Sequence, residues 1–161
     1  MLFRGIYLAN LNEVPLLDEE SHQKIYASFS LLSMLTPPGP LYPSLGDNGG
    51  PLADPILQLG IKMLSHPMCT ELERARMLQK DADPEILPRD FCSTKAGFLC
   101  SRSSYRHDGN YILMSAKTGC GCSGHNHMDL LSLFLTFRGQ AFIGEPYTDK
   151  LYHSIRMNSE L

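Results

Sequence analysis

The stretch at residues 96–145, AGFLCSRSSYRHDGNYILMSAKTGCGCSGHNHMDLLSLFLTFRGQAFIGE, decides the fold of this 161-residue chain. It contains four short runs rich in Phe, Leu, Ile and Tyr, at residues 96–102, 110–116, 130–138 and 140–145. Turn-forming segments separate these runs, and Arg138 with Gly139 between the last two favours a β-hairpin. Short apolar runs bounded by turn residues predict strands, so we expect an antiparallel sheet in this half of the chain.

The residues before this stretch predict helices. Ile25, Phe29, Leu32 and Leu35 recur at spacings of three and four, which places them on one face of a helix over residues 18–35. Acidic residues at positions 18–20 favour the start of this helix. The prolines at positions 37 and 38 end it, because proline lacks an amide donor and clashes with the preceding turn.

Two further helices are predicted after a Pro- and Gly-rich connector at residues 36–53. The first starts with Asp54 as its N-cap and ends before His66 and Pro67, and the second covers residues 69–80. Helices followed by strands, with the change at residues 81–95, predict an α+β fold. Residues 1–80 then form a helical segment and residues 81–161 a β-sandwich segment. With only four or five strands the sandwich is incomplete, so we expect a fragment.

The composition excludes several classes of protein. Apolar residues make up 43% of the chain and charged residues 19%, which is typical of a folded globular protein. The net charge of -3 and the lack of a Lys/Arg stripe argue against a nucleic-acid partner. The longest apolar run, at residues 130–137, is too short to span a membrane, and the N-terminus is a poor signal peptide. Five cysteines leave at least one thiol unpaired, and we expect them to be reduced.

A glycine-rich segment leads into the residues that carry chemistry, GHNHMD at 124–129. Residues i and i+2 of an extended segment point the same way, so His125, His127 and Asp129 share one face. Two imidazoles and a carboxylate on one face are a nucleus for a divalent-metal site. A polar turn in which Asp129 caps backbone amides is the alternative, and spacing alone leaves both open. A cupin-type site fits the glycine-to-histidine spacing but requires a glutamate where the chain has only Asp129.

The stretch from residue 96 to 148 resembles the start of the heparinase II/III-like domain of polysaccharide lyases. That family has a strand ending in Arg-Ser, a Tyr-x-hydrophobic strand, a GHxHxD segment, a hairpin with Arg and Gly at its tip, and an acidic-Pro motif. The matching residues here, in the same order, are Arg102 with Ser103, 111–114, 124–129, Arg138 with Gly139, and Glu145 with Pro146. A similar Gly-Asp connector lies at residues 41–50, so the resemblance covers about residues 40–150.

The resemblance implies an α/α toroid followed by a β-sandwich, with the active cleft between them. Lyases of this family cleave uronic-acid polysaccharides by β-elimination. The uronate carboxylate must be neutralised, the C5 proton removed by a base, and the leaving O4 protonated by an acid. The resemblance also implies an acidic polysaccharide as the partner and a periplasmic or secreted location.

Individual residues inherit roles from the family motif. His125 matches the first His of the motif, which faces the cleft, and is the catalytic candidate. His127 matches a ligand of a structural zinc ion, and Glu145 falls where the family supplies an Asp ligand. The residues expected to support this site are Asp129, Asn126 and Arg102.

One departure from the family concerns the toroid. The family's tyrosine and its carboxylate neutraliser lie there, and no local motif gives these roles to Tyr26 or His22, which we interpret as surface or core residues. We therefore expect little lyase activity from this chain alone. The alternatives are a non-catalytic carbohydrate-binding or structural β-sandwich and a cupin-like metal enzyme.

Overall fold

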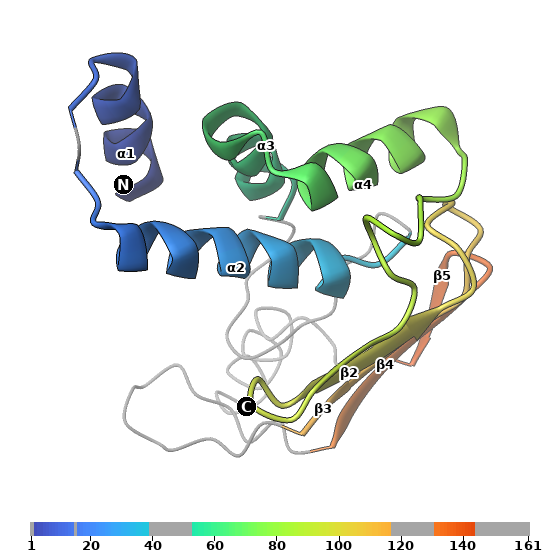
Figure 1. The fold of residues 1–161 in the computed structure, drawn as a ribbon. Helices are drawn as coiled ribbons and strands as arrows, with labels where there is room; N and C mark the ends of the chain where they lie inside the picture. Colours follow the sequence, from blue (N-terminus) through green and yellow to red (C-terminus); the bar gives the residue numbers. More distant parts are fainter. Residues whose placement is uncertain (1, 15, 39–52, 117–130, 144–161) are drawn as a thin grey trace, which may run out of the picture.

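The computed structural model describes residues 2–14, 16–38, 53–116 and 131–143 (Figure 1). Helices come first and strands second, so the predicted α+β class is confirmed. The helices are α1 (Leu2–Leu11), α2 (Glu19–Leu35), α3 (Ala53–Leu64) and α4 (Pro67–Leu78). The strands are β1 (Phe91–Ser93), β2 (Phe98–Arg102), β3 (Tyr111–Ser115), β4 (Ser132–Phe137) and β5 (Gln140–Ile143).

Helix α2 has the ends that the sequence predicts. The Asp18 carboxylate accepts a hydrogen bond from the Ser21 amide at 2.8 Å, which satisfies one of the free amides of the first turn. Thr36 is the C-cap, and the two prolines that follow it are buried. The helix therefore ends against the rest of the protein rather than in solvent.

Helices α3 and α4 pack on α2 and form the first hydrophobic core. Gly60 permits their close approach, because a Cβ there would lie 2.7 Å from the Phe29 ring and 2.9 Å from the Cys69 Sγ. The prediction of Asp54 as the N-cap of α3 is wrong, since the helix already includes Ala53. Helix α4 begins at Pro67, earlier than predicted, with His66 as its N-cap residue and proline in the first turn. Helix α1 was not predicted.

The five strands form one antiparallel sheet in the order β1-β2-β3-β4-β5. The predicted hairpin between β4 and β5 is confirmed: Arg138 and Gly139 have φ values of 50° and 73°, and Phe137 pairs with Gln140. Positive φ at both positions is the geometry of a type I′ turn. Gly139 is required there, because a Cβ would lie 2.0 Å from the His107 carbonyl oxygen. Strand β1 was not predicted.

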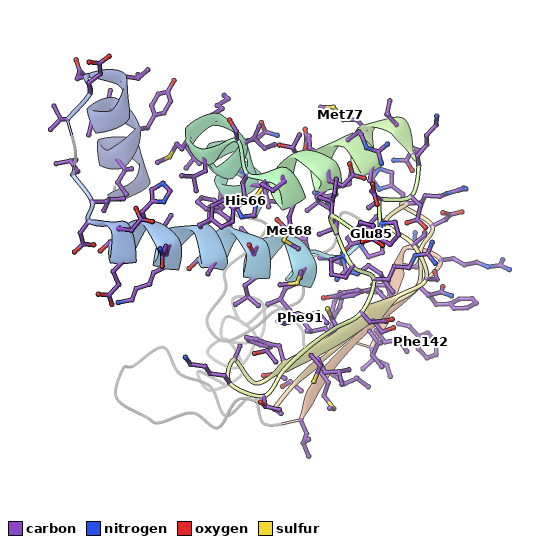
Figure 2. All side chains as sticks on the ribbon, viewed as in Figure 1. His66, Met68, Met77, Glu85, Phe91 and Phe142 are labelled. Carbon is purple, nitrogen blue, oxygen red and sulfur yellow. The ribbon has the colours of Figure 1, made fainter. Side chains whose placement is uncertain are left out.

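The two faces of the sheet differ in their surroundings. The face toward the helices buries the second hydrophobic core, which consists of Cys100, Tyr111, Leu113 and Phe134. On the far side of β5, Phe142 points away from the helices (Figure 2) and is 75% exposed. The described residues contain this single sheet, so a second sheet of a sandwich stays a prediction. Within the same residues, no helix is long and apolar enough to cross a membrane.

Candidate functional site

A cleft of about 630 Å³ lies at the junction of the helices and the sheet. One wall is helix α2, and the other is β1 with the turn that follows it. Figure 2 shows Phe91 on the side of the sheet that faces α2. The residues that line the cleft are His22, Gln23, Tyr26, Ala27, Ser30, Leu31, Met34, Phe91, Ser93 and Ala96.

The α2 wall presents a polar stripe. His22, Tyr26 and Ser30 are spaced four residues apart, so they lie one above another on the same helix face. The His22 side chain is exposed, the Tyr26 side chain is 37% exposed and Ser30 is half-buried. The opposite wall adds the apolar ring of Phe91. A mostly apolar cleft with a few aligned polar groups suits a small ligand or one segment of a polymer.

His66 lies directly behind this stripe, between α2 and the start of α4 (Figure 2). Its side chain is fully buried, and its ring centroid is 4.1 Å from that of Tyr26. The Nε2 atom is 3.1 Å from both the Tyr26 carbonyl oxygen and the Ser30 hydroxyl. Two cleft residues therefore contact the same buried imidazole.

The bond to Tyr26 determines which ring nitrogen of His66 carries a proton. A carbonyl oxygen can only accept, so the bond to Tyr26 requires a proton on Nε2. The Nδ1 atom is buried and has no hydrogen-bond partner among the described residues, so in a neutral ring it is the unprotonated nitrogen. Burial lowers the pKa of His66, and the Tyr26 carbonyl opposes this effect. The ring is neutral at physiological pH.

Arg102, which the sequence predicts to support the site, lies at the C-terminal end of α2. Its guanidinium donates to the Thr36 carbonyl at 2.7 Å and to the Met34 carbonyl. It sits over the rings of Tyr105 and Tyr111, at 4.3 Å and 4.9 Å from their centroids. Helix carbonyls and aromatic faces both stabilise a cation, so they balance this buried charge. Within the part of the chain that the structure describes, no carboxylate pairs with Arg102.

Tyr111 adds a second link between the sheet and α2. Its hydroxyl donates to the Leu35 carbonyl at 2.7 Å, so sheet residues bond three consecutive carbonyls at the helix end. Burial raises the pKa of Tyr111 far above its usual value, although the Arg102 charge opposes the shift. The phenol is therefore a permanent donor in this junction.

The remaining predicted site residues, His125, Asn126, His127, Asp129 and Glu145, lie outside the described residues. Among the residues that are described, no group of three or more His, Cys, Asp or Glu side chains could hold a metal ion. The expectation of reduced cysteines is confirmed for Cys69, Cys92 and Cys100, which are free thiols.

A second hollow lies between the end of α4 and the loop after β2, and three of its charged side chains, Asp81, Arg106 and Asp108, are paired. Asp81 pairs with Arg89 and also accepts from the Tyr105 amide at 3.0 Å. Arg106 pairs with Asp108 at 3.1 Å. These paired charges make the hollow a weaker candidate than the cleft.

His22 and Tyr26 are exposed, in agreement with their interpretation as surface or core residues. The structure also places both in the lining of the cleft, which was not predicted. The four-residue spacing of His22, Tyr26 and Ser30 was a usable signal, because it puts three polar groups on one face of the helix. The Phe91 wall had no comparable local signal.

The chain was compared with protein-family models, with curated proteins and with solved structures. None of these comparisons found a match.

Proposed function

We propose that the chain contributes the substrate cleft of a heparinase II/III-like polysaccharide lyase, which cleaves uronic-acid polysaccharides by β-elimination. The observation that carries the proposal is the cleft between α2 and the β1 side of the sheet. The resemblance to the family implies an active cleft between the helical and sheet parts of the protein. Tyr26 and His22 add proton-transferring groups to that location.

The cleft chemistry suits a sugar chain. Each sugar ring has apolar C–H faces and a rim of hydroxyl groups. The Phe91 ring can pack against such a face, while Ser30 and Tyr26 can bond the hydroxyl groups. The imidazole of His22 is exposed beside them and can bind a uronate carboxylate. A small number of placed polar groups on an apolar surface is the usual design of a small-ligand site.

The elimination step needs a base, an acid and a group that neutralises the carboxylate, and residues of the cleft can fill some of these roles. The phenol of Tyr26 is a candidate to transfer a proton at C5 or O4, and His22 is a candidate to bind the carboxylate. His125 remains the catalytic candidate of the GHxH motif. A structural zinc on His127 and Glu145 remains a prediction, and no step depends on it. The acidic polysaccharide partner and a location outside the cytoplasm are part of the same proposal.

Two measurements test the proposal. The chain is titrated with an unsulfated heparan-type tetrasaccharide and, in parallel, with a neutral glucose tetrasaccharide. We expect saturable binding of the uronate, weakened by His22→Ala and not by His107→Ala, which removes an exposed histidine outside the cleft. Equal binding of both sugars, or binding unaffected by His22→Ala, would contradict the proposal.

The same samples are followed for the absorbance of unsaturated uronate products. Little turnover is expected from the chain alone. Product that disappears in Tyr26→Phe would assign the phenol to the reaction. Binding without product in every form of the protein that contains this chain favours the second candidate, a non-catalytic carbohydrate-binding module, which the amphipathic lining of the cleft also supports.

A further inference from the structure

The buried His66 contacts the cleft wall from the interior. Tyr26 and Ser30 line the cleft on one side of α2 and meet the same imidazole with their ring, carbonyl and hydroxyl atoms. Neither the family resemblance nor the proposed reaction gives this histidine a role. A fully buried polar side chain with one unpartnered nitrogen is costly to keep and calls for a reason.

We propose that His66 is a positioning residue that holds Tyr26 and Ser30 in their cleft-lining conformations, and that it does so only as the neutral, Nε2-protonated ring. This proposal rests on the proposed function for the identity of the ligand. The positioning of Tyr26 and Ser30 by His66 does not depend on which ligand binds.

The backbone of His66 is held by two helices. The His66 amide donates to the Gly60 carbonyl of α3 at 3.2 Å. Its carbonyl accepts from the Thr70 amide and hydroxyl of α4, each at 3.0 Å. The ring is thus attached to the α3–α4 turn and bonds across to α2. A contact between two separately anchored elements fixes their relative position, which a bond within one helix cannot do.

The bond to Tyr26 acts at a specific point of α2. The Tyr26 carbonyl also accepts a longer bond from the Ser30 hydroxyl at 3.3 Å, so one carbonyl, one hydroxyl and one imidazole form a closed triangle. This triangle orients the Ser30 hydroxyl, which would otherwise rotate freely. The tilted ring contact of 4.1 Å orients the Tyr26 phenol.

Protonation would oppose this arrangement. A proton on Nδ1 creates a buried donor without a partner and a charge in an apolar interior. From α2 the ring meets Tyr26, Phe29 and Ser30. The bond to the Gly60 carbonyl of α3 is made by the His66 backbone amide and not by the ring. The buried titratable groups of α4 are the Cys69 thiol, whose pKa burial raises, and Glu71, which is paired with Arg74. Among the described residues, no carboxylate contacts the imidazole to stabilise an imidazolium.

The first test is a pH titration by NMR of protein labelled in its Tyr and His rings, in a His22→Gln background that removes the other imidazole of the cleft. We expect the His66 signals to show a protonated Nε2 and an unprotonated Nδ1. The Tyr26 ring signals should shift with the same midpoint as His66, because the two rings are in contact. A pH-independent Tyr26 ring, or the opposite tautomer, would overturn the proposal.

The second test compares His66→Gln with His66→Phe in binding of the unsulfated heparan-type tetrasaccharide, at a temperature where both are folded. Glutamine can place an amide donor near the Nε2 position, whereas phenylalanine retains a ring without a donor. We expect His66→Phe to lower the affinity about tenfold, which corresponds to the loss of one placed hydrogen bond. His66→Gln should retain most of the affinity of the unmodified protein. Equal affinities in the two variants would overturn the proposal.

Ser30→Ala provides an independent variant that leaves the buried residue intact. We expect it to weaken tetrasaccharide binding and to raise the rate at which the Tyr26 ring flips. If both quantities stayed unchanged, the triangle would have no positioning role. If the unmodified protein does not bind the tetrasaccharide at all, the proposed function fails. The Tyr26 and His66 titration still decides the positioning role.

Discussion

The two ends of helix α2 meet the rest of the protein in different ways. At its C-terminal end, the carbonyls of Met34, Leu35 and Thr36 accept bonds from Arg102 and Tyr111 of the sheet. Further toward its N-terminus, the same helix faces the sheet across an open cleft. Figure 1 shows α2 running beside the sheet. The helix is attached to the sheet by these hydrogen bonds at one end, and a cleft of about 630 Å³ lies beside the rest of it.

The chemistry of the two regions explains this difference. Helix carbonyls at a C-terminus have no partners within the helix and attract a cation, so Arg102 gains several bonds by being buried there. In the cleft stripe, the Ser30 hydroxyl bonds the Tyr26 carbonyl and His66, and the side chains of His22 and Tyr26 are exposed. The closed end stabilises the fold, and the open region is available to a ligand.

Removal of the hydrogen bonds between the sheet and the C-terminal end of α2 should have the largest effect on stability. Arg102→Met leaves the Met34 and Thr36 carbonyls without their charged donor and should lower the free energy of unfolding by about 3–5 kcal/mol. Chemical denaturation measures this. The matched control is Arg106→Met, which removes an exposed ion pair and should cost less than about 1 kcal/mol. Equal stability of the two variants would contradict the assigned role of Arg102.

The hydroxyl of Tyr111 provides a test of the second link between the sheet and α2. Tyr111→Phe removes the hydroxyl that bonds the Leu35 carbonyl and should lower the free energy of unfolding by about 1–2 kcal/mol. Tyr7→Phe on α1, where the side chain is 36% exposed, is the control and should change stability little. A neutral Tyr111→Phe would mean that the sheet does not depend on this bond to hold the helix end.

The buried imidazole predicts a pH dependence of stability. Burial lowers the pKa of His66 in the folded state below its usual value of 6.5, so the unfolded chain binds more protons below that pH. Stability that is fully present above pH 6.5 should decline as the pH falls below it, by at most about 1.4 kcal/mol per pH unit. Urea denaturation from pH 8 to pH 5 should show a flatter profile for His66→Gln. Identical profiles would show that His66 does not titrate in this way.

The smallest effect on stability is expected in the cleft itself. Ser30→Ala removes a half-buried hydroxyl and should lower the free energy of unfolding by less than about 1 kcal/mol. Ser28→Ala is a matched control, since its hydroxyl bonds the helix backbone in the same way but faces solvent. Thermal unfolding should scarcely separate the two variants, whereas binding of the uronate tetrasaccharide should be weaker only in Ser30→Ala. A loss of binding in both would contradict a local role.

Local signals predicted much of the fold. Helix α2 was predicted almost to the residue because its acidic start, its apolar spacing and its terminal prolines all lie within or beside the helix. The β4–β5 hairpin was predicted because its turn requires particular residues. Strand β1 was missed because three residues become a strand only by pairing, with Phe91 opposite Cys100. Helix α1 was missed because its apolar sequence lacks acidic residues in the first turn.

The candidate site was less predictable because its parts are far apart in the chain. Arg102 was assigned to the site from its motif, yet its partner Thr36 lies 66 residues away and no local pattern connects them. His66 reads from sequence as the end of a helix, and its contact with Ser30 spans 36 residues. The cleft exists only because β1 packs beside α2, so its second wall could not be predicted without the pairing of the sheet.

The most direct measurement of the central claim is a two-dimensional NMR titration of the intact chain, labelled in its His, Tyr and Phe rings, with the unsulfated heparan-type tetrasaccharide. Saturable shifts that include His22, Tyr26 and Phe91, while Tyr105 and Phe142 stay unchanged, are the predicted result. Saturable shifts centred on residues away from the cleft, or no shifts at a tetrasaccharide concentration that saturates other uronate-binding proteins, would contradict the assignment of this cleft as the substrate site.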